Sequence, residues 1–121
     1  MADILIVDDD PQATELLHDT LAHFGYDSAV CEDAASALKL IERERPRLVL
    51  LDLALPGSLN GWQLLKGIRK IAPDTACVAI TAYDSTTVEH SARQSGFNDY
   101  FAKPIDPFIL AVIAARFGEE K

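Results

Sequence analysis

Six polar residues follow or end apolar runs of this sequence, at positions where their side chains could form one reactive site. They are Asp8, Asp9, Asp10, Asp52, Thr81 and Lys103. Clustered carboxylates repel one another unless a cation lies among them, and Mg²⁺ commonly binds one or two carboxylates while it keeps several waters. An ammonium and a hydroxyl beside such a metal suit phosphoryl transfer, which depends mainly on positioning and charge neutralisation. An aspartate can itself accept the group and form an aspartyl phosphate.

Each of these residues also has an ordinary structural explanation. Asp10 directly precedes Pro11, which is typical of the cap and first position of a helix. Aspartates are common turn formers after strands, Thr81 could be a simple strand-end hydroxyl, and Lys103 a surface lysine. These residues form a site only if the fold brings them together.

Five short apolar runs, rich in β-branched residues, alternate with segments of helical periodicity. We predict strands at residues 4–7, 26–31, 48–51, 76–80 and 99–102. The predicted helices start after Asp10, Asp33 and Asn60, near Thr86 and after Asp106. Strict alternation implies parallel strands joined by right-handed crossovers, with helices on both faces of the sheet. The sequence therefore predicts a doubly wound (βα)5 fold of the α/β class.

The predicted sheet determines where functional side chains gather. In doubly wound sheets, ligands bind at the carboxyl ends of the strands. Asp8 and Asp9 follow the first strand and Asp52 follows the third, while Thr81 and Lys103 follow the fourth and fifth. We therefore expect the three carboxylates to share one small cleft with the hydroxyl and the ammonium.

Composition limits the function classes. The chain has 121 residues, with 49% hydrophobic and 25% charged residues, which suits one globular domain spanning residues 1–121. Its net charge of −8 repels a phosphate backbone, so we expect no direct binding of nucleic acid. The apolar runs are far shorter than a membrane span, and the first residues lack the pattern of an export leader, so we expect neither membrane insertion nor export. Cys31 and Cys77 lack metal-ligand spacing, so we expect a cytoplasmic protein with free thiols.

Five motifs resemble the receiver domain of two-component response regulators, in the same order and over nearly the whole chain. They are ILIVDDDP at residues 4–11, LLDL at 50–53, LPG at 55–57, ITA at 80–82 and DYFAKP at 99–104. The resemblance implies a flavodoxin-like sheet with strand order 2-1-3-4-5. It also implies a signalling domain that is no enzyme in the usual sense, because it catalyses only its own phosphorylation and dephosphorylation.

The resemblance also implies a role for each site residue. Asp52 is similar to the phosphoacceptor, and Asp8 and Asp9 to the acidic pair that binds Mg²⁺ together with Asp52 and the backbone carbonyl of Ala54. Thr81 and Lys103 are implied to bind the phosphoryl oxygens, and Tyr100 to act with Thr81 as the switch. The peptide bond between Lys103 and Pro104 is implied to be cis. The implied phosphodonor is a sensor histidine kinase or a histidine phosphotransfer protein.

Two features depart from the family pattern. The loop at residues 57–61, which borders the predicted pocket, is one residue longer than usual. Ala54 and Tyr83 occupy positions that control how water reaches the phosphoryl group in relatives. Because Ala54 cannot orient a water and Tyr83 could shield the site, we expect slow self-hydrolysis.

The last predicted helix, at residues 107–117, is apolar on more than one face, and Arg116 is its only charged residue. Leu110, Ile113, Ala114 and Phe117 share the face that would cover the sheet. An outward stripe consists of Phe108, Ala111, Val112 and Ala115. Exposed apolar patches of this kind mark interaction sites. We expect this stripe, within an output face of the fourth helix, fifth strand and fifth helix, to bind a downstream effector or a second copy.

Other function classes fit the residues less well. An aspartyl-phosphate hydrolase needs a second acid two residues after its nucleophile, where this chain has Ala54, and usually a cap domain. A flavodoxin-like cofactor binder needs a phosphate loop rich in Ser, Thr and Gly, where three aspartates would repel a flavin phosphate. The alternative that stays open is a degenerate receiver, acting as a phosphorylation-independent protein-interaction module.

Overall fold

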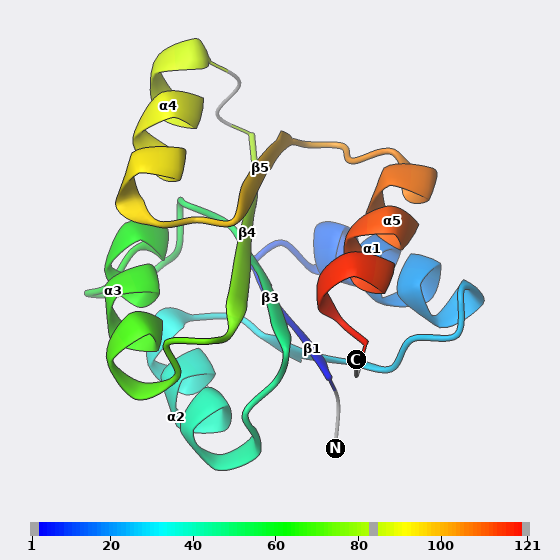
Figure 1. Cartoon of the computed structure of the whole chain (residues 1–121), viewed down its shortest axis with the longest axis horizontal. Helices are drawn as coiled ribbons and strands as arrows, with labels where there is room; N and C mark the ends of the chain where they lie inside the picture. The colour runs from blue at the N-terminus through cyan, green and yellow to red at the C-terminus, as the bar shows by residue number, and fades with distance from the viewer. Residues whose placement is uncertain (1–2, 83–84, 120–121) are drawn as a thin grey trace.

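The computed structural model describes residues 3–82 and 85–119. Within these ranges five strands alternate with five helices, as predicted (Figure 1). The strands are β1 (Ile4–Val7), β2 (Ser28–Cys31), β3 (Leu48–Leu51), β4 (Ala76–Thr81) and β5 (Asp99–Ala102). The helices are α1 (Pro11–His23), α2 (Ala34–Glu44), α3 (Gly61–Ile71), α4 (Thr86–Ser95) and α5 (Pro107–Phe117).

All neighbouring strands pair in parallel, in the order β2-β1-β3-β4-β5. The helices α1 and α5 cover one face of the sheet, and α2, α3 and α4 cover the other (Figure 1). Side chains of each strand alternate between the two faces, so Leu5 and Val7 pack towards α2 and α3 while Ile4 and Ile6 pack towards α1 and α5. The predicted fold class and strand order are confirmed.

Helix starts agree with the predicted caps. The side chains of Asp10, Asp33 and Asn60 accept hydrogen bonds from backbone N–H groups in the first turns of α1, α2 and α3. Such caps satisfy N–H groups that have no partner inside the helix. The start of each helix after its strand is therefore determined locally.

Two strand boundaries were predicted wrongly. The strand expected at residues 76–80 runs one residue further, because Thr81 pairs with Ala102 of β5. The strand expected at residues 26–31 begins at Ser28, which pairs with Ile4 of β1. Tyr26 instead belongs to the turn after α1, because its N–H donates to the carbonyl of Leu21 at 2.9 Å and its hydroxyl donates to Glu119. Tyrosine favours strands, but here the backbone N–H of Tyr26 is hydrogen-bonded to the end of α1 instead of to a neighbouring strand.

The two cysteines and the helix lengths bear on two expectations drawn from composition. Cys31 on β2 and Cys77 on β4 are free thiols, and two strands separate them. Among the residues that the structure describes, no helix has both the length and the apolar character needed to span a bilayer.

Candidate functional site

Strand register brings the predicted acidic residues to one edge of the sheet. Val7 of β1 pairs with Leu51 of β3, so Asp8 and Asp52, the residues that follow, leave neighbouring strands at the same level. The N–H of Asp52 donates to the carbonyl of Val7 at 3.0 Å and extends the pairing by one residue. The convergence of Asp8 and Asp52 therefore follows directly from the parallel pairing of β1 and β3.

Lys103 enters the same edge from β5. Ala102 pairs with Thr81 of β4, and the N–H of Lys103 donates to the carbonyl of Thr81 at 2.8 Å. The next peptide bond, between Lys103 and Pro104, is cis, as the resemblance implied. Thr81 and Lys103 thus lie at the carboxyl ends of β4 and β5, at the same edge of the sheet as Asp8 and Asp52.

The Lys103 ammonium bridges the two buried carboxylates. Its Nζ lies 2.5 Å from Oδ2 of Asp8 and 2.9 Å from Oδ2 of Asp52. The two aspartates are only 3% and 7% exposed. Burial lowers the pKa of Lys103, but hydrogen bonds and charges from Asp8 and Asp52 outweigh burial, and the net pKa is raised from 10.5. The ammonium therefore stays charged at neutral pH, and the stability it contributes is lost only as the pH rises above about 10.5.

Backbone donors orient the other carboxylate oxygens. Oδ1 of Asp8 accepts a hydrogen bond from the N–H of Asp10 at 3.0 Å, and Oδ1 of Asp52 accepts one from the N–H of Ala54 at 3.2 Å. Each carboxylate is thus held by one backbone donor and one ammonium. Charge-assisted hydrogen bonds are short and geometrically specific, so they fix the orientation of both carboxylates.

The remaining predicted residues lie around this core of the site. Thr81 is buried at the end of β4, and Asp9 and Ala54 are exposed at the rim. Tyr100 is buried on β5, where it pairs with Ala79 and packs into the core beneath α2, α3 and α4. Tyr83 lies outside the described residues.

The donor set suits a hard divalent cation. The carboxylates of Asp8, Asp9 and Asp52 and the carbonyl of Ala54 are oxygen donors, which Mg²⁺ prefers, and Mg²⁺ needs only one or two carboxylates because it retains waters. Within residues 3–82 and 85–119, no three His, Cys, Asp or Glu side chains are already arranged as a metal cluster. Instead, the carboxylates of Asp8 and Asp52 point at a common cation, the Lys103 ammonium. The residues present therefore fit Mg²⁺.

Sequence reasoning missed the part that Gly61 plays in the site. A Cβ at this first residue of α3 would overlap the carbonyl oxygen of Asp52 and lie 2.6 Å from Cα of Leu53. The N–H of Gly61 also donates to the carbonyl of Leu53 at 2.9 Å. The start of α3 thus packs directly against the backbone of Asp52. The available signal was a glycine directly after the cap residue Asn60.

The apolar stripe of α5 lies mostly at the surface. Phe108 and Val112 are 74% and 66% exposed, and Ala115 is exposed as well, whereas Ala111 is half-buried. The ring of Phe108 makes an edge contact with Phe24 after α1, at a centroid distance of 6.3 Å. The exposed apolar surface therefore continues from α5 towards α1.

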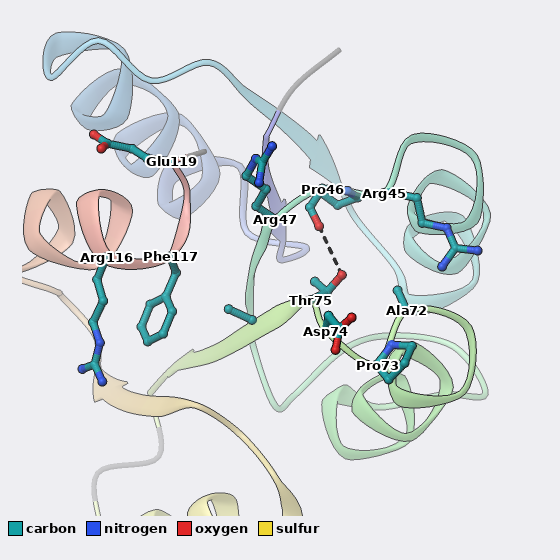
Figure 2. A pocket seen from close by; sticks show the side chains of 11 residues that line it. Arg45, Pro46, Arg47, Ala72, Pro73, Asp74, Thr75, Arg116, Phe117 and Glu119 are labelled. Atoms are coloured by element: carbon teal, nitrogen blue, oxygen red, sulfur yellow. Dashed lines mark hydrogen bonds between the residues drawn. The ribbon is translucent and has the colours of Figure 1, made fainter. Parts of the chain in front are cut away.

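A second cleft, of about 630 Å³, lies at the opposite edge of the sheet. Three arginines line it, but Figure 2 shows the side chains of Arg45, Arg47 and Arg116 pointing apart. Arg45 donates to the carbonyl of Ile71, and the guanidinium of Arg116 lies 4.9 Å from the ring centre of Phe117. The three guanidinium groups of this cleft therefore do not converge on one point. In the acidic pocket, by contrast, the carboxylates of Asp8 and Asp52 converge on the Lys103 ammonium.

Comparisons with known proteins agree with this geometry. A model of the family described as response regulator receiver domain matches residues 4–114. The chain belongs to this family. It is therefore a signalling domain rather than a classical enzyme, from a family whose members are phosphorylated and interact with histidine kinases and effectors.

Individual relatives of this receiver domain come from several bacteria. An uncharacterised 14.6 kDa protein of Leptolyngbya boryana is 38% identical over 117 residues, covering 95% of this chain and 88% of that protein. The DNA-binding response regulator MtrA of Mycolicibacterium smegmatis is 40% identical over 114 residues, which cover 93% of this chain and 49% of MtrA. The receiver domain thus spans only about half of that curated relative.

Solved structures show the same fold. The receiver domain of NtrX from Brucella abortus has 35% identity and a TM-score of 0.87, covering 93% of this chain and 95% of that chain. The receiver domain of the sensor histidine kinase PA1611 from Pseudomonas aeruginosa PAO1 has 30% identity and a TM-score of 0.85, covering 94% of each chain. That structure carries a magnesium ion in its active site cleft.

Proposed function

We propose that this receiver domain accepts a phosphoryl group on Asp52 from a phosphohistidine of a sensor histidine kinase or a histidine phosphotransfer protein. The observation that carries the proposal is the buried Asp52 carboxylate, whose Oδ2 lies 2.9 Å from the Lys103 ammonium. An anionic nucleophile held beside a fixed cation suits an acceptor of an anionic phosphoryl group. We further propose that residues 1–121 form one such domain, supported by the match over residues 4–114.

The proposed reaction is a phosphoryl transfer to Asp52 in which the neighbouring residues position the group and neutralise its charge. A carboxylate oxygen of Asp52 attacks phosphorus in line with the departing histidine nitrogen, so an O–P bond forms as the N–P bond breaks. Lys103 neutralises charge on the phosphoryl oxygens, and the Thr81 hydroxyl donates to one of them. A bound Mg²⁺, held by Asp8, Asp9, Asp52 and the carbonyl of Ala54, would supply further charge neutralisation. Magnesium in the cleft of the PA1611 receiver domain supports this assignment.

The product would add a charge of about −1.5 to −2 to the pocket. We propose that Thr81, drawn towards the phosphoryl group, and Tyr100 then shift the output face of α4, β5 and α5 between two populations. The burial of Tyr100 beside β4 supports a coupling between the two residues, because its neighbour in register, Ala79, lies two residues before Thr81.

The first test is the intact mass after incubation with acetyl phosphate. We expect a gain of one phosphoryl group that requires Mg²⁺ and disappears when the metal is removed with EDTA. Electrostatic neutralisation by the metal is worth several kcal/mol in the transition state, so the reaction without metal should be at least about a hundredfold slower. A gain that is equal with and without Mg²⁺ would contradict the metal assignment.

A failure to gain any phosphoryl group from acetyl phosphate or a phosphohistidine protein would favour the second candidate, the degenerate receiver that acts as an interaction module. The exposed Phe108 and Val112 support a docking role for α5 in either case. The proposed partner is a downstream effector protein or a second copy of the chain, bound through Phe108, Ala111, Val112 and Ala115.

Replacing Phe108 with glutamate tests the α5 surface. Apolar residues at the centre of an interface typically contribute at least about 1–2 kcal/mol to binding, so we expect association to weaken at least about tenfold. Light scattering and sedimentation would measure self-association, and titration would measure effector binding. Ala35→Glu places the same charge on the exposed face of α2 and serves as control. Equal association of both variants and the natural chain would contradict a role for α5.

A further inference from the structure

Arg69, in the last turn of α3, joins segments that lie far from the acidic pocket. Its Nη1 donates to the carbonyl oxygens of Pro73 at 3.4 Å and Thr75 at 2.6 Å. Its Nη2 donates to the carbonyl of Gly96 at 2.9 Å and to Oδ1 of Asn98 at 3.0 Å. One side chain thus fastens the end of α3 to the start of β4 and to the end of α4.

The contact with Gly96 supports the end of α4 directly. Gly96 caps this helix in the left-handed region, at φ 108°. The last carbonyl groups of a helix have no partner inside it, and Arg69 supplies a charged donor to the carbonyl of the cap residue. This interaction ties the C-terminal end of α4 to α3.

Asn98 holds the turn between α4 and β5 against β4. Its Oδ1 accepts a hydrogen bond from the N–H of Cys77 at 2.8 Å as well as the one from Arg69. Its own N–H donates to the carbonyl of Cys77 at 2.7 Å. Arg69 therefore adds to a turn that is already paired with a central region of the sheet.

Two further contacts fasten the same end of the helix. Arg93 donates to Oδ1 of Asp99 at 3.0 Å, joining α4 to β5. Phe97 is buried and makes an edge contact with Trp62 of α3, at a centroid distance of 5.9 Å. The C-terminal end of α4 thus carries both polar and aromatic attachments.

Within the part of the chain that the structure describes, the N-terminal half of α4 makes few buried contacts. Ala92 is the single buried residue among Thr86–Ser95. Val88 is half-buried, and Thr86, Thr87 and His90 are exposed. Elements with few buried apolar contacts open and shift at low free-energy cost. Among the contacts of the described residues, more attachments therefore hold the C-terminal end of α4 than its N-terminal end, which follows Thr81 along the chain.

We propose that Arg69 makes the C-terminal end of α4 a fixed pivot, so that phosphorylation of Asp52 displaces only the first two turns of the helix. The surface that changes on phosphorylation then comprises residues 86–91, while residues 92–98 stay in place as a constant part of the output face. Arg69 is a positioning residue here, because it acts through α4 and touches neither Asp52 nor Lys103. The inference rests on the proposed phosphorylation of Asp52.

Hydrogen–deuterium exchange of the whole chain tests the pivot, with beryllium fluoride and Mg²⁺ as the phosphoryl analogue. In the natural chain we expect the analogue to change exchange in residues 86–91 and to leave residues 92–98 unchanged. In Arg69→Gln we expect residues 92–98 to exchange at least about tenfold faster without the analogue, and the analogue-induced change to spread into them. A general loss of stability would also raise exchange in β1 and β3, so those strands serve as the internal reference.

Two further variants separate geometry from charge. Lys70→Gln removes a positive charge from the next, exposed position of α3 and should behave as the natural chain. Arg69→Lys keeps the charge but lacks the planar fork that reaches several acceptors at once, so it should resemble Arg69→Gln. If Arg69→Lys behaved as the natural chain, the positive charge alone would hold the end of α4, and the proposed role of the hydrogen bonds from the Arg69 guanidinium would be wrong.

The outcomes also separate the pivot from the proposed function. A normal response of residues 48–54 to beryllium fluoride, with α4 changing along its whole length in the natural chain, would overturn the pivot alone. Unchanged exchange of residues 92–98 in Arg69→Gln would do the same. If residues 48–54 did not respond at all, the proposed function would fail, and the pivot would fail with it as a device of phosphorylation.

Discussion

The Asp52→Asn variant is expected to gain no phosphoryl group from acetyl phosphate while it still folds. An amide lacks the anionic oxygen that would attack phosphorus, so the reaction loses its nucleophile. The substitution keeps the size of the side chain and leaves the Lys103 ammonium 2.5 Å from Oδ2 of Asp8. Removing one of two buried carboxylates also removes a repulsion and leaves Lys103 paired with Asp8, so the free energy of unfolding should change less than in a variant that lacks Lys103. Intact mass and urea denaturation would measure the two effects.

A matched control separates this expectation from a general effect of charge removal. Asp74→Asn removes an exposed carboxylate at the opposite edge of the sheet and should be phosphorylated as fast as the natural chain. If Asp52→Asn still gained one phosphoryl group at the natural rate, the acceptor would be another residue, which peptide mapping would identify. That result would remove the observation on which the proposed function rests.

The strands were predictable because the sheet is covered on both faces. All four residues of β1 and of β3 are buried, so both strands appear in the sequence as continuous apolar runs with the observed bounds. Strand β2 lies at the edge of the sheet, and Val30 in its middle is 42% exposed. Its sequence signal is correspondingly weaker, which explains why its start at Ser28 was placed two residues too early.

The site was predictable to the extent that topology determines it. Asp8 and Asp52 each come directly after a central strand, and parallel pairing of those strands leaves them no freedom to separate. Lys103 could be placed at the same edge by the same rule. The rule says nothing about which oxygen each side chain contacts, so the bridge from Lys103 to both carboxylates emerges only from the structure.

Contacts between residues that are far apart along the chain leave no local pattern in the sequence, so they could not be predicted. The guanidinium of Arg69 reaches Gly96 and Asn98, which are 27 and 29 positions further along the chain. Helical periodicity places Arg69 at the end of α3 but cannot choose its acceptors, because these depend on how α3 and α4 pack on the sheet. The contact between Phe24 and Phe108 has the same origin, in the packing of α1 beside α5.

Replacing Lys103 with methionine is expected to slow phosphorylation by about 10²–10³-fold and to lower the free energy of unfolding by about 2–4 kcal/mol. The catalytic loss follows because a fixed cation no longer faces the phosphoryl oxygens. The stability loss follows because Asp8 and Asp52 remain buried without their shared counter-charge. The rate of mass gain and urea denaturation would measure the two effects, with Lys66→Met on the exposed face of α3 as control.

The electrostatic origin of this loss can be separated from a loss of packing by two further measurements. Mg²⁺ should stabilise Lys103→Met more than the natural chain, because the divalent cation replaces the missing charge among the same oxygens. The stability gap between the two proteins should also narrow above about pH 10.5, since the raised pKa of Lys103 means that its contribution is present below this pH and disappears as the ammonium deprotonates. A gap that stayed constant through this range and did not respond to Mg²⁺ would assign the loss to the aliphatic part of the side chain, and Lys103 would no longer be the charge that organises the pocket.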